Sequence, residues 1–221
     1  MYTKINEKDS AMKLGAIYSK EKTTFTLFSP VADSVFVIFY DKGNDSAETG
    51  RLEMMRGEGE LRSIFSATAE GNLDGVYYTY EVHTADGTFS SHDPYARACG
   101  VNGHRSMVID LSKTDPDGFA DEDRPKLADP MSMVITEVSI ADVSADASAH
   151  SRYPGKFKAF TEDKILSYFK DMGVTHLQLM PSYDFASIDE SDSLKEQYNW
   201  GYDPYNYNVP EGSYSTDPFN G

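Results

Sequence analysis

Aromatic side chains crowd the last 25 residues of the chain, in a segment that suits neither a regular helix nor a strand. Residues 197–221 read QYNWGYDPYNYNVPEGSYSTDPFNG and hold seven rings among Asn, Gly, Pro, Asp and Ser. Rings on a polar loop can stack on the apolar faces of sugars, while neighbouring amides and carboxylates bind the hydroxyls. The alternative is a loop whose rings pack on one another and whose Tyr hydroxyls bond to backbone. The segment predicts a sugar-binding loop, with the self-packed loop left open.

Other residue types that carry chemistry are few or wrongly spaced. Cys99 is the only cysteine, which excludes an internal disulfide and gives no thiolate spacing for a metal. His176 alternates with apolar neighbours, as a structural histidine does, and His92 and His104 receive the same interpretation. The acidic run at 121–123 lacks the alternating ligands of a calcium loop, and no Gly-rich phosphate loop follows a predicted strand. We therefore predict no metal site and no cofactor.

Charge limits the partners. The chain has 20 Lys and Arg against 36 Asp and Glu, a formal net charge of −16. Nucleic acid and anionic membranes would need a basic face that the sequence does not concentrate anywhere, whereas a neutral polysaccharide meets no electrostatic conflict. The N-terminus has no apolar run of signal-peptide length and no stretch could cross a bilayer. We expect a soluble, cytoplasmic protein that binds neither nucleic acid nor membrane.

Residues 1–111 have the pattern of short strands broken by turns. In the stretch LDGVYYTYEVHTADG, Tyr78, Tyr80 and Val82 share one face and polar residues the other, which is the period of a strand. Asp-Gly pairs at 74–75 and 86–87 mark its two ends as turns. This spacing predicts an antiparallel, immunoglobulin-like β-sandwich.

Residues 112–130, SKTDPDGFADEDRPKLADP, lose that alternation and concentrate Asp, Pro and Gly. Exposed connections between domains have this composition. We predict a linker here, followed by a second domain over residues 131–221.

The pattern changes after the predicted linker. Residues 131–140 and 173–181 predict strands that are apolar on both faces, and residues 161–172 predict an amphipathic helix between them. Thr161 is placed to cap that helix and Gly173 to end it. Strand, helix, strand with a tight last turn predicts a βαβ unit with parallel strands.

Length then bears on the fold. A (β/α)8 barrel needs about 250 residues, far more than 131–221 supplies. We therefore expect the start of an incomplete (β/α)8 barrel, namely a first βαβ unit and its loop, and a chain that is the front part of something longer. Two strands with open edges leave self-association through unpaired sheet edges as an alternative.

Several quoted stretches resemble bacterial type I pullulanases, debranching members of the α-amylase superfamily and of glycoside hydrolase family 13. YNWGYDP at 198–204 resembles the family signature, and residues 173–190 resemble the second barrel strand and its loop. Residues 14–41 and 92–111 resemble the preceding family 48 carbohydrate-binding module. The resemblance runs from about Leu14 to Asn220.

The resemblance implies recognition of α-glucan (pullulan, glycogen or starch) by part of an enzyme that hydrolyses α-1,6 branches. Such a retaining mechanism needs two carboxyl groups roughly 5 Å apart. The family's catalytic groups follow its fourth, fifth and seventh barrel strands, so the resemblance assigns no catalytic residue here and implies that this chain alone is inactive. A non-catalytic glucan-binding module and a degenerate structural remnant remain as alternatives.

The resemblance does assign substrate-binding residues. Tyr202 matches the family tyrosine that stacks on the sugar beside the cleavage point, and Asp203 matches its polar neighbour. Trp200 and Asn199 shape the same loop, as contacts or as scaffold. The first predicted barrel strand departs from the family pattern, because Thr136, Ser139 and Ala141 replace Tyr, His and Arg. This departure implies relaxed constraint or a specialised paralogue.

Overall fold

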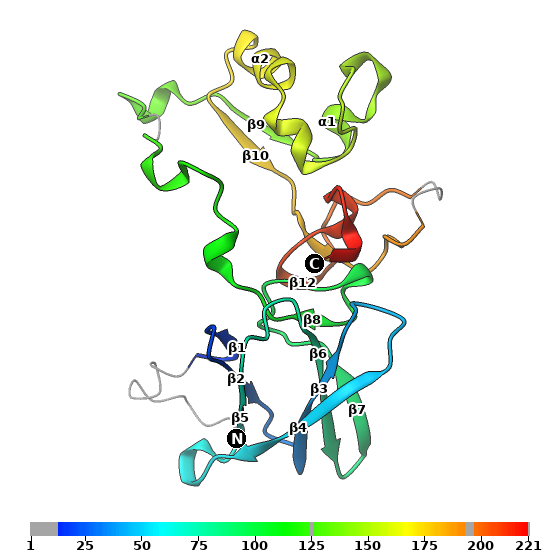
Figure 1. The fold of residues 1–221 in the computed structure, drawn as a ribbon. Coiled ribbons are helices and arrows are strands. Elements are labelled where there is room, and N and C mark those ends of the chain that lie inside the picture. The colour runs from blue at the N-terminus through cyan, green and yellow to red at the C-terminus, as the bar shows by residue number, and fades with distance from the viewer. Residues whose placement is uncertain (1–12, 124–125, 193–196, 221) are drawn as a thin grey trace. The chain divides into compact units, whose positions relative to one another are not determined.

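The computed structural model describes residues 13–123, 126–192 and 197–220, which fold as two units (Figure 1). Within the described residues, the first unit comprises 13–110 together with 206–209 and 219–220. The second unit comprises 111–205 and 210–218. No helix in the described part of the chain is long and apolar enough to cross a membrane. The expected cytoplasmic location stays a prediction.

The first unit is built on one eight-stranded sheet. Its strands are β1 (Gly15–Tyr18), β2 (Lys22–Phe28), β3 (Ser34–Tyr40), β4 (Glu48–Arg56), β5 (Ile64–Glu70), β6 (Tyr77–Thr84), β7 (Gly87–Ser91) and β8 (Ser106–Met107). The spatial order is β1-β2-β5-β4-β3-β6-β7, with β8 beside β6. The paired strands run antiparallel.

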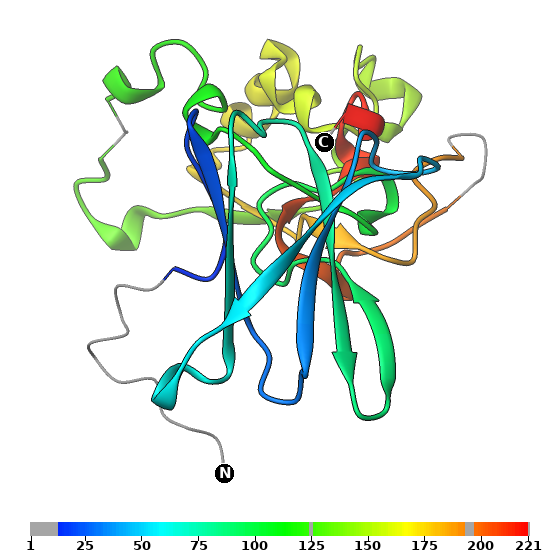
Figure 2. The same ribbon diagram turned by 60° about the horizontal axis from the view of Figure 1, so that its bottom comes forward.

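Strand β4 explains how one sheet makes a sandwich. Its residues from Glu48 to Met54 pair with β3, whereas Met55 and Arg56 pair with β5. The sheet curls along β4 (Figure 2), so that Phe25 and Phe65 of one half meet β3 and β6 of the other in a common core. The predicted antiparallel β-sandwich is confirmed, with the detail that its two halves share a strand.

The alternation predicted for β6 holds on one face only. Tyr78 and Tyr80, which were predicted to share one face, are both buried in the main core. Thr79, on the opposite face, is buried as well, and Tyr77 packs in a second cluster with Ala98 and Met107. The first half of β6, Tyr77 to Tyr80, is therefore buried on both faces.

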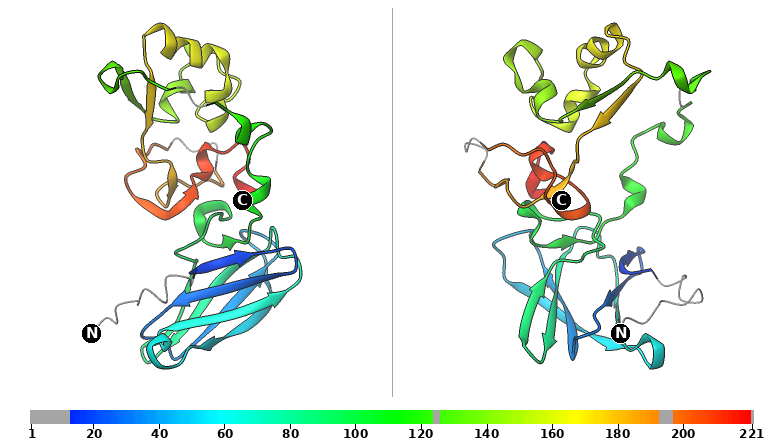
Figure 3. Two further views of the ribbon diagram at one scale, coloured as in Figure 1. Left: turned by 90° about the vertical axis from the view of Figure 1, so that its left-hand side faces the viewer. Right: turned by 180° about the vertical axis from the view of Figure 1, so that it is seen from behind.

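The second unit contains two parallel strands, β9 and β10, the helices α1 and α2, and strand β11, which pairs with β12. Its elements are β9 (Ile135–Val138), α1 (Asp142–Ala145), α2 (Asp163–Asp171), β10 (His176–Leu179), β11 (Tyr183–Phe185) and the two ends of β12 (Pro204–Pro210), whose residues 206–209 are assigned to the first unit. Strand β10 pairs with β9 in parallel (Figure 3), and Val138 packs against Ile165 and Phe169 of α2. The predicted strand-helix-strand order with parallel strands is confirmed.

The predicted start of the helix was wrong. Helix α2 begins at Asp163 after Glu162, which provides no side-chain cap. Thr161 instead ends a 3-10 helix, Phe157–Thr161, and its hydroxyl donates to the carbonyl of Lys158 at 2.8 Å. The predicted end was right: Gly173 has a φ of +77°, a left-handed conformation that suits glycine at a helix C-terminus.

The two parallel strands, predicted to be apolar on both faces, are only partly buried. Ile135 is 58% exposed and His176 is exposed, while Val138 is the buried residue of β9. Apolar residues on both faces become buried only when both faces are covered, and α2 covers one of them. The described residues of 112–130 are all exposed and contain short 3-10 turns.

Candidate carbohydrate-binding site

Three polar side chains of the loop between β11 and β12 are joined by hydrogen bonds. The two carboxylate oxygens of Asp203 accept from Asn199 Nδ2 at 2.8 Å and from Ser187 Oγ at 2.7 Å. Asn199 Nδ2 also contacts Ser187 Oγ, and Asn199 Oδ1 accepts from the amide of Gly201 at 2.6 Å. The hydrogen bonds from Ser187 and Asn199 lower the pKa of Asp203. These hydrogen bonds therefore keep the carboxylate of Asp203 ionised next to the exposed rings.

Position 201 of this loop requires glycine. Its φ is +84°, and a Cβ built there would lie 2.0 Å from the carbonyl oxygen of Pro181. Any other residue would face both the left-handed backbone conformation and that collision. The close approach of Gly201 to Pro181 thus fixes the path of the chain between Trp200 and Tyr202.

Three rings of the loop are exposed while their polar atoms are hydrogen-bonded. Tyr198, Trp200 and Tyr202 are 61%, 59% and 63% exposed. Trp200 Nε1 donates to the Tyr198 hydroxyl at 2.6 Å, and that hydroxyl donates to Asp142 Oδ2 at 3.0 Å. The Tyr202 hydroxyl donates to Glu137 Oε1 at 3.4 Å. Rings held by their polar atoms and open on their apolar surfaces are suited to stacking against a ligand.

Other rings of the same segment behave differently. Tyr214 is buried and packs edge-on against Phe157 and Phe185, with ring centroids 5.6 Å and 5.9 Å away. Tyr205 and Tyr207 are exposed, at 38% and 65%. The self-packed alternative therefore describes Tyr214, and the exposed arrangement describes the rings of the YNWGYDP stretch.

The structure gathers the four predicted residues in one loop but gives them different environments. Tyr202 and Trp200 present exposed rings, whereas Asn199 and Asp203 direct their polar atoms to each other and to Ser187. Their contacts with substrate stay predictions.

Sequence reasoning missed Tyr198, Ser187, Glu137 and Asp142. The signal for the last two was their place in and directly after the first predicted strand of the second unit, since ligand loops gather at the carboxyl ends of parallel strands.

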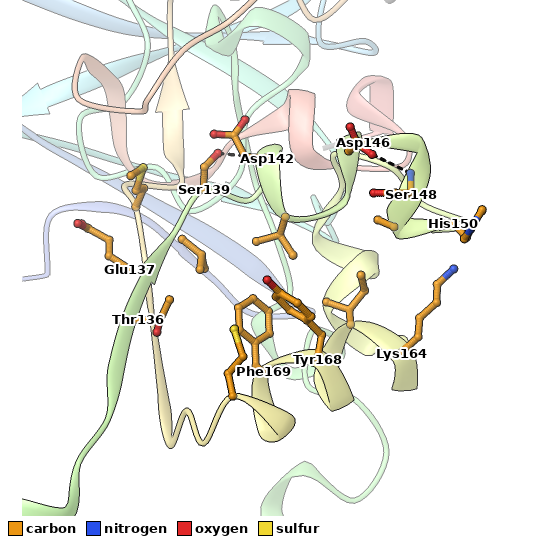
Figure 4. Close-up of a pocket in the computed structure, with 16 residues that line it drawn as sticks. Thr136, Glu137, Ser139, Asp142, Asp146, Ser148, His150, Lys164, Tyr168 and Phe169 are labelled. Carbon is orange, nitrogen blue, oxygen red and sulfur yellow. Dashed lines mark hydrogen bonds between the residues drawn. The ribbon is translucent and has the colours of Figure 1, made fainter.

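A cavity of about 780 Å³ lies between β9, α1 and α2 (Figure 4). Glu137 and Asp142, the two acceptors for the loop tyrosines, both line it. Tyr168, Phe169 and Lys164 of α2 line the opposite side. The carboxylates of Glu137 and Asp142 thus both accept hydrogen bonds from the loop tyrosines and line this cavity.

Three buried carboxyl groups lie close together near the turn after β12. Oxygen atoms of Asp184, Glu190 and Glu211 lie within 4.8 Å of one another, a spacing that could suit a cation. Glu211 Oε2 accepts from the Phe185 amide and its Oε1 from the Ser213 amide, both at 2.9 Å. Glu190 Oε1 accepts from Gly212 at 3.0 Å. Because backbone donors occupy both oxygens of Glu211 and one of Glu190, these two residues act as a hydrogen-bonded support for the turn after β12.

Burial raises the pKa of Glu211, against hydrogen bonds from Ser213 and Phe185 that lower it. Lys156 donates to the carbonyl of Ser213 at 2.6 Å. Burial lowers the pKa of this lysine, while the charges of Glu211 and Glu190 raise it. A partly buried ammonium group therefore offsets part of the negative charge of the cluster.

The first unit matches a known class of domain. Residues 13–96 match the family described as carbohydrate-binding module 48, the isoamylase N-terminal domain. In its sequence match and its fold, the sandwich is therefore similar to carbohydrate-binding modules of this family.

Nearly the whole chain is similar to pullulanases. It is 32% identical over 216 residues to the pullulanase of Bacillus subtilis, covering 93% of this chain and 28% of that protein. A crystal structure of pullulanase from Paenibacillus barengoltzii in complex with maltohexaose and α-cyclodextrin matches with a TM-score of 0.89 and 39% identity. That match covers 95% of this chain and 34% of the crystallised chain.

A maltotriose complex of the pullulanase from an Anoxybacillus species matches with a TM-score of 0.83 and 34% identity, over 93% of this chain and 30% of that one. These findings confirm the resemblance to pullulanases. The chain spans about a third or less of the length of these three proteins.

Proposed function

We propose that this chain is the α-glucan recognition part of a pullulanase-like glycoside hydrolase of α-1,6 branch linkages. The observation that carries the proposal is the YNWGYDP loop, whose Trp200 and Tyr202 rings are about three-fifths exposed while their polar atoms are bonded to protein. The net charge of −16 suits a neutral polysaccharide better than an anionic partner. The maltooligosaccharides named for the two crystallised pullulanases support the same ligand class.

Calorimetric titration with maltohexaose tests the proposal. The chain is expected to bind, and Tyr202→Ala to weaken binding about tenfold, which corresponds to about 1.4 kcal/mol. Phe119→Ala is the matched control, because Phe119 is an exposed ring of the second unit, 48% exposed, outside the loop. Binding that Tyr202→Ala leaves unchanged would contradict this site, and no binding by the unmodified chain would favour a degenerate remnant.

No catalytic residue is proposed in this chain. Incubation of the purified chain with pullulan is expected to release no reducing sugar, and turnover above the level of contaminating host enzymes would overturn this part. A chain that binds glucan in the titration yet belongs to no hydrolase in any longer form would support the alternative of a non-catalytic module.

We infer further that β9, α2 and β10 form the first βαβ unit of a (β/α)8 barrel. In the described residues neither strand pairs with a third one, and Ile135, Leu179 and Met172 expose apolar side chains around them. Further strands and helices of a barrel would cover these groups.

A chimera can test the barrel proposal. It would join this chain to the part of the Bacillus subtilis pullulanase that the alignment leaves out. Hydrogen exchange at the amides of Ile135–Val138 is expected to slow in the chimera. Unchanged exchange in a folded chimera would contradict the barrel, and slow exchange only at high protein concentration in the unmodified chain would favour self-association.

A further inference from the structure

A chain of hydrogen bonds joins the exposed rings to a residue outside their loop, and its direction is fixed by chemistry. An indole nitrogen can only donate, and an ionised carboxylate can only accept. The Tyr198 hydroxyl therefore accepts from Trp200 Nε1 and uses its single proton on Asp142 Oδ2. The order is Trp200 to Tyr198 to Asp142, and the carboxylate is its end point.

Asp142 is held independently of the loop. It is the first residue of α1, directly after the β9 segment, and its amide faces the hydroxyl of buried Ser139 at 3.4 Å. Tyr198 lies 56 residues further along the chain. A charge-assisted hydrogen bond from the loop to this element restrains rings that otherwise have few packing partners.

We propose that Asp142 is a positioning residue for the ring-bearing loop. Asp142 acts through Tyr198 to fix the indole of Trp200 in the orientation that receives an α-glucan. The identity of the ligand rests on the proposed function. The restraint of the indole rests only on the hydrogen bonds from Trp200 to Tyr198 and from Tyr198 to Asp142. The charge and geometry of Asp142 make it a determinant of affinity without direct contact with the sugar.

The neighbouring Asp146 provides a matched control. It lines the same cavity as Asp142 and lies in the same short stretch of chain. Its Oδ1 accepts from the amide of Ser148 at 2.7 Å, so it serves the local turn and not the loop. A difference between variants at Asp142 and Asp146 therefore reports the tie to Tyr198 and excludes a general effect of removing a carboxylate there.

The first measurement follows the indole without sugar. Trp200 is the only tryptophan of the chain, so fluorescence anisotropy and acrylamide quenching report on it alone. Asp142→Ala and Tyr198→Phe are expected to raise the quenching constant about twofold and to lower the anisotropy, since one hydrogen bond of ordinary strength is lost. Asp142→Asn is expected to give an intermediate value, because its amide oxygen still accepts but carries no charge, and Asp146→Ala is expected to match the unmodified chain.

The second measurement is a titration of the full chain with maltohexaose. Asp142→Ala and Tyr198→Phe are expected to bind about three- to tenfold more weakly, the range for one hydrogen bond. Quenching unchanged in both variants would overturn the positioning role, whatever the sugar does. If Asp142→Ala fails to fold, Tyr198→Phe decides alone. If the unmodified chain binds no maltohexaose, the proposed function fails, and the quenching data still decide the role of Asp142.

Discussion

The two units differ in how completely they cover their own hydrophobic surfaces. In the first unit, eight antiparallel strands enclose a core in which Phe25, Val35 and Tyr80 are fully buried. In the second, α2 covers one face of two parallel strands, and Ile135 and Met172 stay about half exposed. The exposed rings Trp200 and Tyr202 belong to the less enclosed unit. The comparison indicates that the enclosed core and the loop proposed to bind the ligand belong to different parts of the chain.

The largest expected effect tests the difference in the two cores. Phe25→Ala should destabilise the first unit by about 3–5 kcal/mol, because a fully buried ring leaves a cavity. Phe169→Ala in α2 should cost less, about 2 kcal/mol, since its surroundings are open enough to collapse. Urea denaturation, with Trp200 fluorescence for the second unit and far-ultraviolet circular dichroism for the sheet, measures both. Equal losses would remove the distinction between the units.

The next effect sharpens the description of the loop. Gly201→Ala should destabilise the second unit by about 1–3 kcal/mol and weaken maltohexaose binding, because the left-handed backbone and the Pro181 carbonyl both oppose a Cβ. Gly155→Ala is the control: its φ of +72° is similar, but the nearest atom to its added Cβ is 3.9 Å away. If the two variants behaved alike, backbone conformation alone would account for the requirement, without the collision.

The pH dependence of the stability of the second unit tests the contribution of buried Glu211. Burial raises the pKa of Glu211, so its stabilising contribution is complete below the ordinary pKa of glutamate, about 4.3, and is lost as pH rises through the raised value. The free energy of unfolding of the second unit should fall over that window, with a slope of at most about 1.4 kcal/mol per pH unit for one proton.

Urea titrations from pH 4 to 9, followed by Trp200 fluorescence, measure the response. Glu211→Gln should abolish this slope, and exposed Glu53→Gln in the first unit should not change it. A second unit that becomes more stable over the same window would contradict the assignment.

The smallest effect concerns the buried carboxyl of the first unit. Asp93 Oδ2 accepts from the Tyr78 hydroxyl at 2.7 Å and from the Tyr80 hydroxyl at 3.1 Å. Tyr78→Phe should cost the first unit about 1 kcal/mol, because Tyr80 still donates. Tyr80→Phe, which removes the longer bond, should cost less. A larger loss from Tyr80→Phe in denaturation would show that the longer bond carries more of the network.

The sequence allowed prediction wherever the cause was local or carried by a long motif. The alternation around Tyr78 and Tyr80 predicted a strand, Gly173 predicted the end of α2, and the YNWGYDP stretch led to the ring-bearing loop. Thr161 was misassigned because a preceding 3-10 helix, which has no strong pattern, uses the same residue. Partners from distant segments were out of reach: Tyr198 and Tyr202 bond to residues 56 and 65 positions away. Neither spacing nor composition encodes such a pairing.

The shared strand β4 has a consequence for how the first unit assembles. Neither half of the sheet has its full complement of strands without β4, so the halves cannot form as independent folding units. The pairing of β2 with β5 also closes a long stretch of chain, Lys22 being opposite Glu70, and such non-local pairings slow folding. We therefore expect the sandwich to fold slowly and in one cooperative step, in which the pairing of β4 completes both halves of the sheet.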